Sequence, residues 1–315
     1  MTPEEAGHPE IDAAIAGLER AGELAERGQF DDALKECEAA ATAFEMYDGA
    51  LSPDLANVLN TLSSIQFERA EYEAAVQAAT RSADILERLG DRFTGPEAAL
   101  IRSQAYSALG TALRTQGRYR EAEPWLQRAL AAVEAEFGAG HAESGAACNN
   151  LAIVYKYTAE YDKAETLYRR ALAISETHFG VDAPESASIY HNLGGLDHAR
   201  GEFAAGEPHA RKAYEIRLRA LGAEDPATAA DAAALAGVLD GLERYEESEL
   251  LYSYALGVFE RVYGPDHYEI AVNLNNLAAI RREQDQPEEA ERLFRRALEI
   301  KRRVLGNASP DTAVT

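Results

Sequence analysis

The amino-acid sequence predicts an all-α fold, a solenoid built from about seven helix–turn–helix repeats. The composition favours helix, because alanine, glutamate, leucine and arginine are abundant while only 23 glycines and 11 prolines occur in 315 residues. A second observation is a period of 42 residues, interrupted once by an interval of 47. The period is set by an aromatic position that holds Phe30, Tyr72, Tyr119, Tyr161, Phe203 and Tyr245, with Pro287 in its place in the last repeat.

The period also fixes the order of repeats along the chain. Residues 1–9 form an N-terminal tail, and the one longer interval indicates an extended loop at 91–96. Residues 307–315 parallel the segments that open earlier repeats, so they begin an incomplete eighth repeat or form a tail. Between these ends we expect a single solenoid domain, residues 10–306, with repeats at about 10–49, 52–90, 97–138, 139–180, 181–222, 223–264 and 265–306.

The first helix of each repeat is marked by a leucine ten residues before the aromatic position. A small residue follows each leucine, and Arg20 replaces the leucine in the first repeat. Leucine at helical spacing forms one apolar stripe, and the small neighbour lets an adjacent helix approach closely. The leucines are Leu62, Leu109, Leu151, Leu193, Leu235 and Leu277.

The second helix of each repeat begins at the aromatic position. Acidic residues or proline occupy its first turn, as at Asp31 and Pro287, and both suit the positive end of a helix. Small residues follow three and ten positions after the aromatic, as at Ala33 and Ala40. The helix is expected to end on a glycine in a left-handed cap conformation. These glycines are Gly138, Gly180, Gly222, Gly264 and Gly306.

Charge and composition exclude several classes of partner. With 54 acidic against 31 basic residues, the net charge is −23, which repels nucleic acid and anionic membranes. No apolar stretch is long enough for a membrane span, and the first residues lack the pattern of a signal peptide. Cys37 and Cys148 both fall on apolar helix faces, so we expect reduced core thiols in a cytoplasmic protein.

At the repeated leucine, small-residue, aromatic and glycine positions, the chain resembles the tetratricopeptide repeat, and more narrowly the long-repeat type of kinesin light chains. The best copy reads Asn149-Asn150-Leu151-Ala152, then Tyr161-Asp162-Lys163-Ala164-Glu165. The resemblance covers roughly residues 10–306 and is weaker in the sixth repeat, where Ala233-Ala234 replaces the asparagine pair. It implies a right-handed superhelix whose first helices line a concave groove, on which relatives hold extended peptides.

Two sets of polar residues, each at an equivalent position in successive repeats, are expected to face such a groove; we call them the polar columns. The residue five positions after each leucine is basic in most repeats, and amides precede the leucines. Amides both donate and accept, so they can pair with an extended peptide backbone without reading its sequence. The expected groove residues are Asn60, Arg114, Asn149, Asn150, Lys156, His191, Asn192, His198, Asn275, Asn276 and Arg282.

The same polar columns have a plainer interpretation. A solvated helix face would also be polar, and paired asparagines can serve hydrogen bonds between repeats. If the basic column does bind a ligand, it favours an acidic peptide or a free C-terminal carboxylate. Asp240 and Glu283 interrupt that column.

The sequence gives little support for catalysis. Phosphate-binding loops, zinc-finger spacings and nucleophile elbows are absent from it, so we expect no enzyme activity, no cofactor and no metal. His191 and His198 share a helix face, but seven residues at 1.5 Å each separate them by about 10.5 Å, too far to hold one ion alone.

Three functional hypotheses remain, with a protein or peptide as the expected partner and, for the sensor, a small ligand as the alternative. The chain is an adaptor that binds a peptide segment, a sensor whose superhelix changes pitch on binding, or a chaperone-like subunit of a larger assembly. The last helix pair lacks a polar capping helix. Its apolar face is therefore expected to be covered by self-association or a partner, with fraying as the alternative; it comprises Leu293, Phe294, Ile300 and Leu305.

Overall fold

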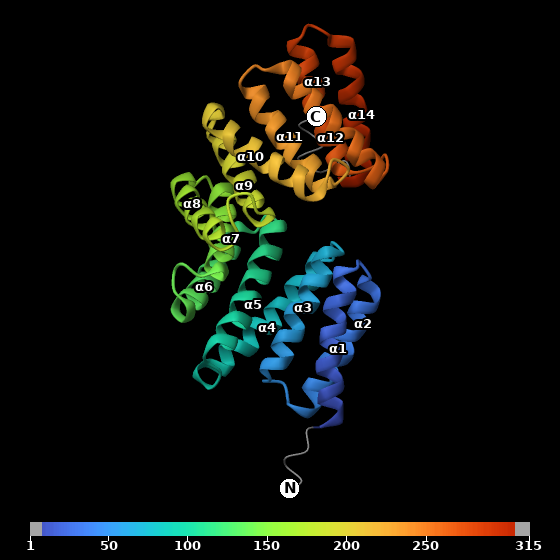
Figure 1. Ribbon diagram of the computed structural model, residues 1–315. Coiled ribbons are helices and arrows are strands. Elements are labelled where there is room, and N and C mark those ends of the chain that lie inside the picture. Colours follow the sequence, from blue (N-terminus) through green and yellow to red (C-terminus); the bar gives the residue numbers. More distant parts are fainter. Residues whose placement is uncertain (1–7, 306–315) are drawn as a thin grey trace. The chain divides into compact units, whose positions relative to one another are not determined.

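The all-α prediction is confirmed by a computed structural model, which describes residues 8–305 (Figure 1). Within these residues the chain forms fourteen α-helices and a short 3-10 turn, η1 (Gly90–Arg92), and no strand. It divides into two compact units, Met1–Ile174 and Ser175–Thr315. The two units are described separately below, and the expectation of one continuous solenoid domain stays a prediction.

The helices alternate as the period predicts, one pair for each expected repeat. The first helices are α1 (Pro9–Glu26), α3 (Pro53–Glu68), α5 (Pro96–Thr115), α7 (Ala142–Tyr157), α9 (Pro184–Arg200), α11 (Pro226–Gly241) and α13 (Tyr268–Glu283). The second helices are α2 (Phe30–Tyr47), α4 (Tyr72–Leu89), α6 (Tyr119–Phe137), α8 (Tyr161–His178), α10 (Phe203–Leu221), α12 (Tyr245–Tyr263) and α14 (Pro287–Leu305). The expected loop at 91–96 is η1 and the residues that lead into α5.

Packing within each unit follows the order of a solenoid. From α1 to α7 and from α9 to α14, the two helices of a repeat pack on each other, and a second helix also packs on the first helix of the next repeat. First helices contact one another as well, α1 with α3, α3 with α5 and α5 with α7 in the first unit, and α9 with α11 and α11 with α13 in the second. Neighbouring first helices therefore form one continuous face in each unit.

The turn between the two helices of a repeat contains a feature that the sequence reading missed. At one position of this turn the backbone takes a positive φ in all seven repeats. Glycine takes it at Gly201, with φ 75° and ψ 14°, whereas Ala159 takes it with φ 61°. A left-handed conformation costs a residue with a side chain about 1–2 kcal/mol, so the packing of the two helices imposes this turn where glycine is absent.

The glycine that ends each second helix differs from the expected cap. Gly138 has φ 84° and ψ 165°, and Gly222 has φ 84° and ψ 174°. The positive φ was predicted, but the left-handed cap was wrong, because ψ near 180° turns the chain into an extended segment instead. Only glycine adopts this region easily. Gly306 lies outside the described residues, as does the expected start of an eighth repeat.

The small residues of the first helices permit very close packing. A Cβ added to Gly110 would lie 2.5 Å from Cγ of Leu126, which is buried on α6 of the same repeat. Both cysteines also belong to the core, as expected, and neither is bonded to another residue. Burial raises the pKa of the Cys37 thiol to about 12 and that of Cys148 to about 11, so both stay protonated at neutral pH.

Gly110→Ala tests the close packing. The added methyl collides with Leu126, so we expect a loss of about 1–3 kcal/mol in the free energy of unfolding, despite the better helix propensity of alanine. Gly22→Ala is the control, because nothing lies within 4 Å of a Cβ added in that helix. It should gain about 0.5–1 kcal/mol. Denaturant titration measures both, and a stabilised Gly110 variant would contradict the packing explanation.

Candidate functional site

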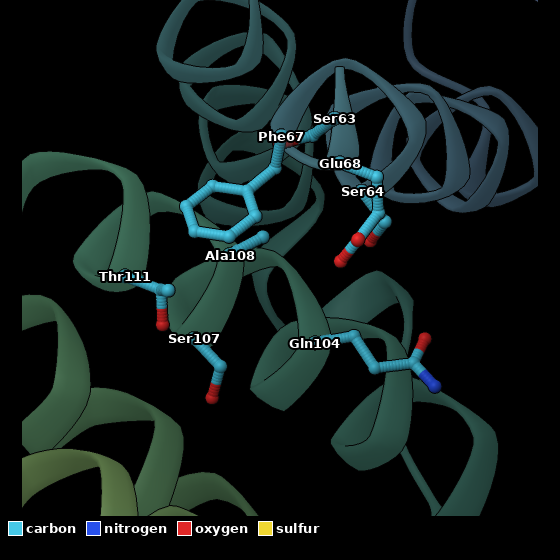
Figure 2. Close-up of a pocket in the computed structure, with 8 residues that line it drawn as sticks. All are labelled: Ser63, Ser64, Phe67, Glu68, Gln104, Ser107, Ala108 and Thr111. Atoms are coloured by element: carbon cyan, nitrogen blue, oxygen red, sulfur yellow. The ribbon is translucent and has the colours of Figure 1, made fainter. Parts of the chain in front are cut away.

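The first unit has a hollow on the face of its first helices. It lies between α3 and α5 and has a volume of about 300 Å³. Figure 2 shows Phe67 and Glu68 of α3 facing Gln104, Ser107 and Thr111 of α5. Ser63, Ser64 and Ala108 complete the lining.

The lining of this hollow combines polar groups, the carboxylate of Glu68 and one aromatic ring. Ser107 and Thr111 provide hydroxyls, Gln104 provides an amide, and Phe67 provides an apolar wall. Hydroxyls and amides both donate and accept hydrogen bonds, as a peptide backbone requires. Phe67 and Thr111 do not belong to the predicted groove residues, because those positions hold amides and basic side chains. The spacing could have identified Phe67, because Phe67 follows Leu62 by five residues just as Arg114 follows Leu109.

Asn60 does not line this open face, contrary to the expectation. Its side chain is 5% exposed, its amide nitrogen donates to the Ile101 carbonyl at 3.1 Å, and its oxygen accepts from the Ser82 hydroxyl at 2.7 Å. These bonds join α3, α4 and α5. Asn60 therefore connects repeats, which is the plainer interpretation of the amide column.

Arg114 and Lys156 occupy equivalent positions on the contacting first helices α5 and α7. Both side chains are half-buried. Burial lowers the pKa of Lys156, and the positive charge of Arg114 lowers it further. Within residues 8–305, neither forms an ion pair with a carboxylate.

An aromatic ledge adjoins Lys156. The ring of Tyr157 is 55% exposed and stacks on Tyr119 of α6, with 5.2 Å between the ring centres. The Lys156 ammonium lies 5.0 Å from the centre of the Tyr157 ring. Asn149 and Asn150 are half-buried one to two turns earlier on α7. The first unit therefore presents hydroxyls, two cations and an aromatic surface on one face.

In the second unit, His191 belongs to a buried ionic cluster. Its Nδ1 lies 2.6 Å from a carboxylate oxygen of Asp231, which is 2% exposed. The other oxygen of Asp231 accepts from Arg217 at 2.6 Å, and Arg217 also donates to Ser188 at 2.8 Å. The cluster joins α9, α10 and α11, so one edge of the His191 ring serves the packing of repeats.

Two further histidines of this unit, His209 and His198, have separate contacts. Asp197 is buried and lies 2.8 Å from Nδ1 of His209 on α10. His198 is exposed, with its ring edge-on to Phe203 at 5.3 Å. Throughout residues 8–305, no group of three or more histidine, cysteine, aspartate or glutamate residues is placed to hold a metal ion.

The other expected groove residues of the second unit occupy varied surroundings. Asn192, Asn275 and Asn276 are half-buried, and Asn276 hydrogen-bonds the buried hydroxyl of Tyr252. The Asn275 side-chain oxygen is buried and finds no hydrogen-bond partner in the described range. Arg282 is exposed and lies 3.2 Å from Glu283. Only some of these amides are therefore available to a ligand.

The basic column is interrupted in the second unit, as the sequence indicated. Asp240 replaces a cation on α11, and its pKa is raised by burial and by the nearby charge of Glu283. The nearby His198 has the opposite effect and lowers the pKa of Asp240. This face therefore mixes charges, whereas the Arg114–Lys156 pair of the first unit is purely cationic.

The expected apolar face at the last helix pair is smaller than predicted. Ile300 is 1% exposed, so the expectation of exposure was wrong for this residue, whereas Leu293 is half-buried against the core of the second unit. Phe294 lines a hollow of about 380 Å³ together with Arg282 and Leu298. The side chain of Leu305 lies outside the described part of the structure. Among helices within residues 8–305, none is both long and apolar enough to cross a bilayer.

Comparison with known proteins identifies the repeat. A family model described as tetratricopeptide repeat matches residues 102–177, 185–257 and 230–303, which is more than half of the chain. The chain belongs to the tetratricopeptide repeat family. No curated protein matches this tetratricopeptide repeat (TPR) chain in sequence.

Solved structures resemble the TPR chain in fold. The apo form of RapI has a TM-score of 0.70 and 14% identity, over 93% of this chain and 98% of RapI. A Rap protein complexed with Competence and Sporulation Factor has a TM-score of 0.61 and 15% identity, and the match covers 94% of this chain and 76% of that protein. The TPR-like repeats of a putative kinesin light chain of Podosopora anserina have a TM-score of 0.53 and 19% identity, and the match covers 66% of this chain and 98% of that chain.

Asp231→Ala tests the ionic cluster of the second unit. Removing this buried carboxylate leaves Arg217 without its partner, so we expect a loss of about 3 kcal/mol in the free energy of unfolding. Glu224→Ala is the control, because Glu224 pairs with Arg261 at 2.6 Å on the exposed surface and should contribute less than about 1 kcal/mol. Equal losses in thermal or denaturant unfolding would show that Asp231 is not a structural centre.

Proposed function

We propose that this TPR protein is a non-enzymatic interaction scaffold that binds an extended peptide segment of a partner protein. The observation that supports it is the hollow between α3 and α5, which combines hydroxyls, an amide and one aromatic wall on a face made of first helices. An extended segment laid across this face would find partners for its backbone and space for one side chain.

The surroundings of the hollow support the same role. Arg114 lies one helical turn beyond Thr111, so a segment that leaves the hollow toward α7 meets the cationic pair and then Tyr157. Aromatic and arginine side chains are the residues most often responsible for binding energy in protein interfaces. The membership of the TPR family and the fold shared with Rap proteins agree with a protein or peptide partner.

A sensor is a second candidate, supported by one comparison. The structure that resembles this chain over 94% of its length is a Rap protein complexed with Competence and Sporulation Factor. In a sensor, peptide binding would also change the arrangement of the repeats. Small-angle scattering separates the two roles, because a scaffold keeps its radius of gyration on binding and a sensor changes it.

The scaffold proposal is tested by blocking the hollow. Peptides of about 12 residues are selected by phage display on the wild-type protein, and their dissociation constants are measured by fluorescence polarisation. Ala108→Phe places a ring in the hollow, and we expect binding to weaken at least about tenfold, roughly 1.4 kcal/mol.

Ala131→Phe is the matched control, because Ala131 is exposed on α6 of the same unit and does not line the hollow. It should leave the dissociation constants unchanged. Circular dichroism confirms that both variants fold. Equal affinity for the wild type and the Ala108 variant, or a selection without binders, would overturn the proposal.

A further inference from the structure

Helix α14, the last one in residues 8–305, differs from the earlier second helices at one apolar position. Seven residues after the aromatic position, the side chain is at most 4% exposed in the six preceding repeats. In α14 this residue is Phe294, which is only half-buried and lines the hollow of about 380 Å³. We propose that this face of α14 is a docking surface for an amphipathic helix of a partner protein, which places an acidic side chain against Arg302.

The preceding repeat shows what covers this position elsewhere in the chain. The equivalent of Phe294 in α12 is Tyr252, which packs with Leu277 of α13, the first helix of the next repeat. The hydroxyl of Tyr252 also hydrogen-bonds Asn276 of that helix. A helix that covers Phe294 would therefore take the place on α14 that α13 takes on α12. Its apolar side chains would fill the hollow, which Leu298 also lines.

The charge at a position beside this face is reversed in α14. Fifteen residues after the aromatic position, the last repeat has the exposed Arg302, whereas five of the six preceding repeats have glutamate. Glu45 lies 2.8 Å from Arg81 of α4, and Glu260 lies 2.5 Å from Arg296 of α14. The position therefore faces the following repeat. The glutamates are Glu45, Glu87, Glu134, Glu176 and Glu260.

A first helix also reaches this position. Glu87 accepts a hydrogen bond of 2.6 Å from the hydroxyl of Tyr106 on α5, and Glu176 accepts one of 2.5 Å from Tyr190 on α9. Both tyrosines lie three residues before the repeat leucine of the first helix that follows. An acid at the same position of a helix docked on α14 would therefore meet the guanidinium of Arg302. Two parallel hydrogen bonds can join these groups.

A second copy of this chain does not supply the acid. Its first helix has Gly17 three residues before the position of the repeat leucine, and α2 has Ala39 where α4 has Arg81. A repeat with arginine at the position of Arg81 would bring two cations together at Arg302. Arg302 therefore disfavours a further repeat of the chain's own kind and favours an acidic partner.

The other charges of α14 agree with an acidic partner. This helix has six basic residues against four acidic ones, although the whole chain has a net charge of −23. Arg282 and Arg295 line the hollow, together with Glu291, which lies 2.5 Å from Arg295. Arg302 forms no ion pair with any of the residues 8–305. Complementary charge on the docking helix would speed association and fix its register.

Selection of helices tests the docking surface. The template is α11 (Pro226–Gly241), because it packs on α10, where its Asp231 accepts from Arg217 at 2.6 Å. Phage display presents this helix on a small helical scaffold, with the positions that would face α14 varied. Helices selected on the full-length wild type should carry Asp or Glu at the position of Ala232, three residues before the leucine. Arg302→Glu should weaken their binding at least about tenfold, and a new selection on it should place Lys or Arg there.

Arg292→Glu is the matched control. Arg292 is exposed on the same helix and does not line the hollow, so its reversal changes the net charge equally, away from the docking surface. The affinity should change less than about twofold, since exposed charges act weakly through salt solution.

Phe294→Ser tests the apolar part of the surface. Burial of a phenylalanine ring is worth about 10-fold or more in affinity, so the same helices should bind this variant at least about tenfold more weakly. Circular dichroism and thermal melting confirm that the Arg302, Arg292 and Phe294 variants fold.

The outcomes are separate from those of the scaffold proposal. Ala108→Phe, which blocks the α3–α5 hollow, should leave helix binding unchanged. A library without binders would overturn the docking surface, and so would helices that bind the Arg302 and Phe294 variants as tightly as the wild type. Equal losses in the Arg292 and Arg302 variants would mean that only net charge matters, which also contradicts it. Dimerisation of the wild type in sedimentation that Phe294→Ser abolishes would assign the surface to a second copy instead.

Discussion

The close contact between the two helices of a repeat is the constraint on which the rest of this structure depends. It requires a small residue after the repeat leucine, and Gly110 against Leu126 shows how little room there is. In the second unit, a Cβ added to Gly194 would lie 3.0 Å from the backbone nitrogen of Ala210, which is also a tight contact. Because the second helices fill the core side in this way, each first helix keeps one face open, and successive open faces adjoin within a unit.

The open face differs between the units. The apolar core residues recur in each repeat, whereas the polar residues of the first helices differ from repeat to repeat. In the first unit, Ser107, Arg114 and Lys156 form no side-chain hydrogen bond or ion pair with any of the residues 8–305. In the second unit, His191 and Arg217 are engaged by the buried Asp231. Polar residues of one column thus either hold repeats together or remain available to a ligand, and buried acids on neighbouring helices make the difference.

The candidate site could be predicted only in outline. Arg114 and Lys156 were identified from their spacing, because basic residues at a fixed helical position stand out in an acidic chain. Asn60 was misassigned, since its sequence position matches Asn149 while Ser82 and the Ile101 carbonyl occupy its amide. Phe67 and the hydroxyls of the hollow escaped notice because serine, threonine and phenylalanine occur widely, and only their convergence between α3 and α5 gives them meaning.

The sequence by itself determined the all-α fold, the pairing of helices in about seven repeats and the residue at which each second helix begins. A 42-residue period of leucine, small and aromatic residues has one physical solution, since each helix has a single apolar stripe to bury. Tertiary structure alone decided which polar side chains are paired with one another, as with Asp231 and His191, and which form no ion pair within residues 8–305, as with Arg114 and Lys156. The reason is that hydrogen bonds and ion pairs depend on distances of about 3 Å between helices, which a pattern along one helix does not specify.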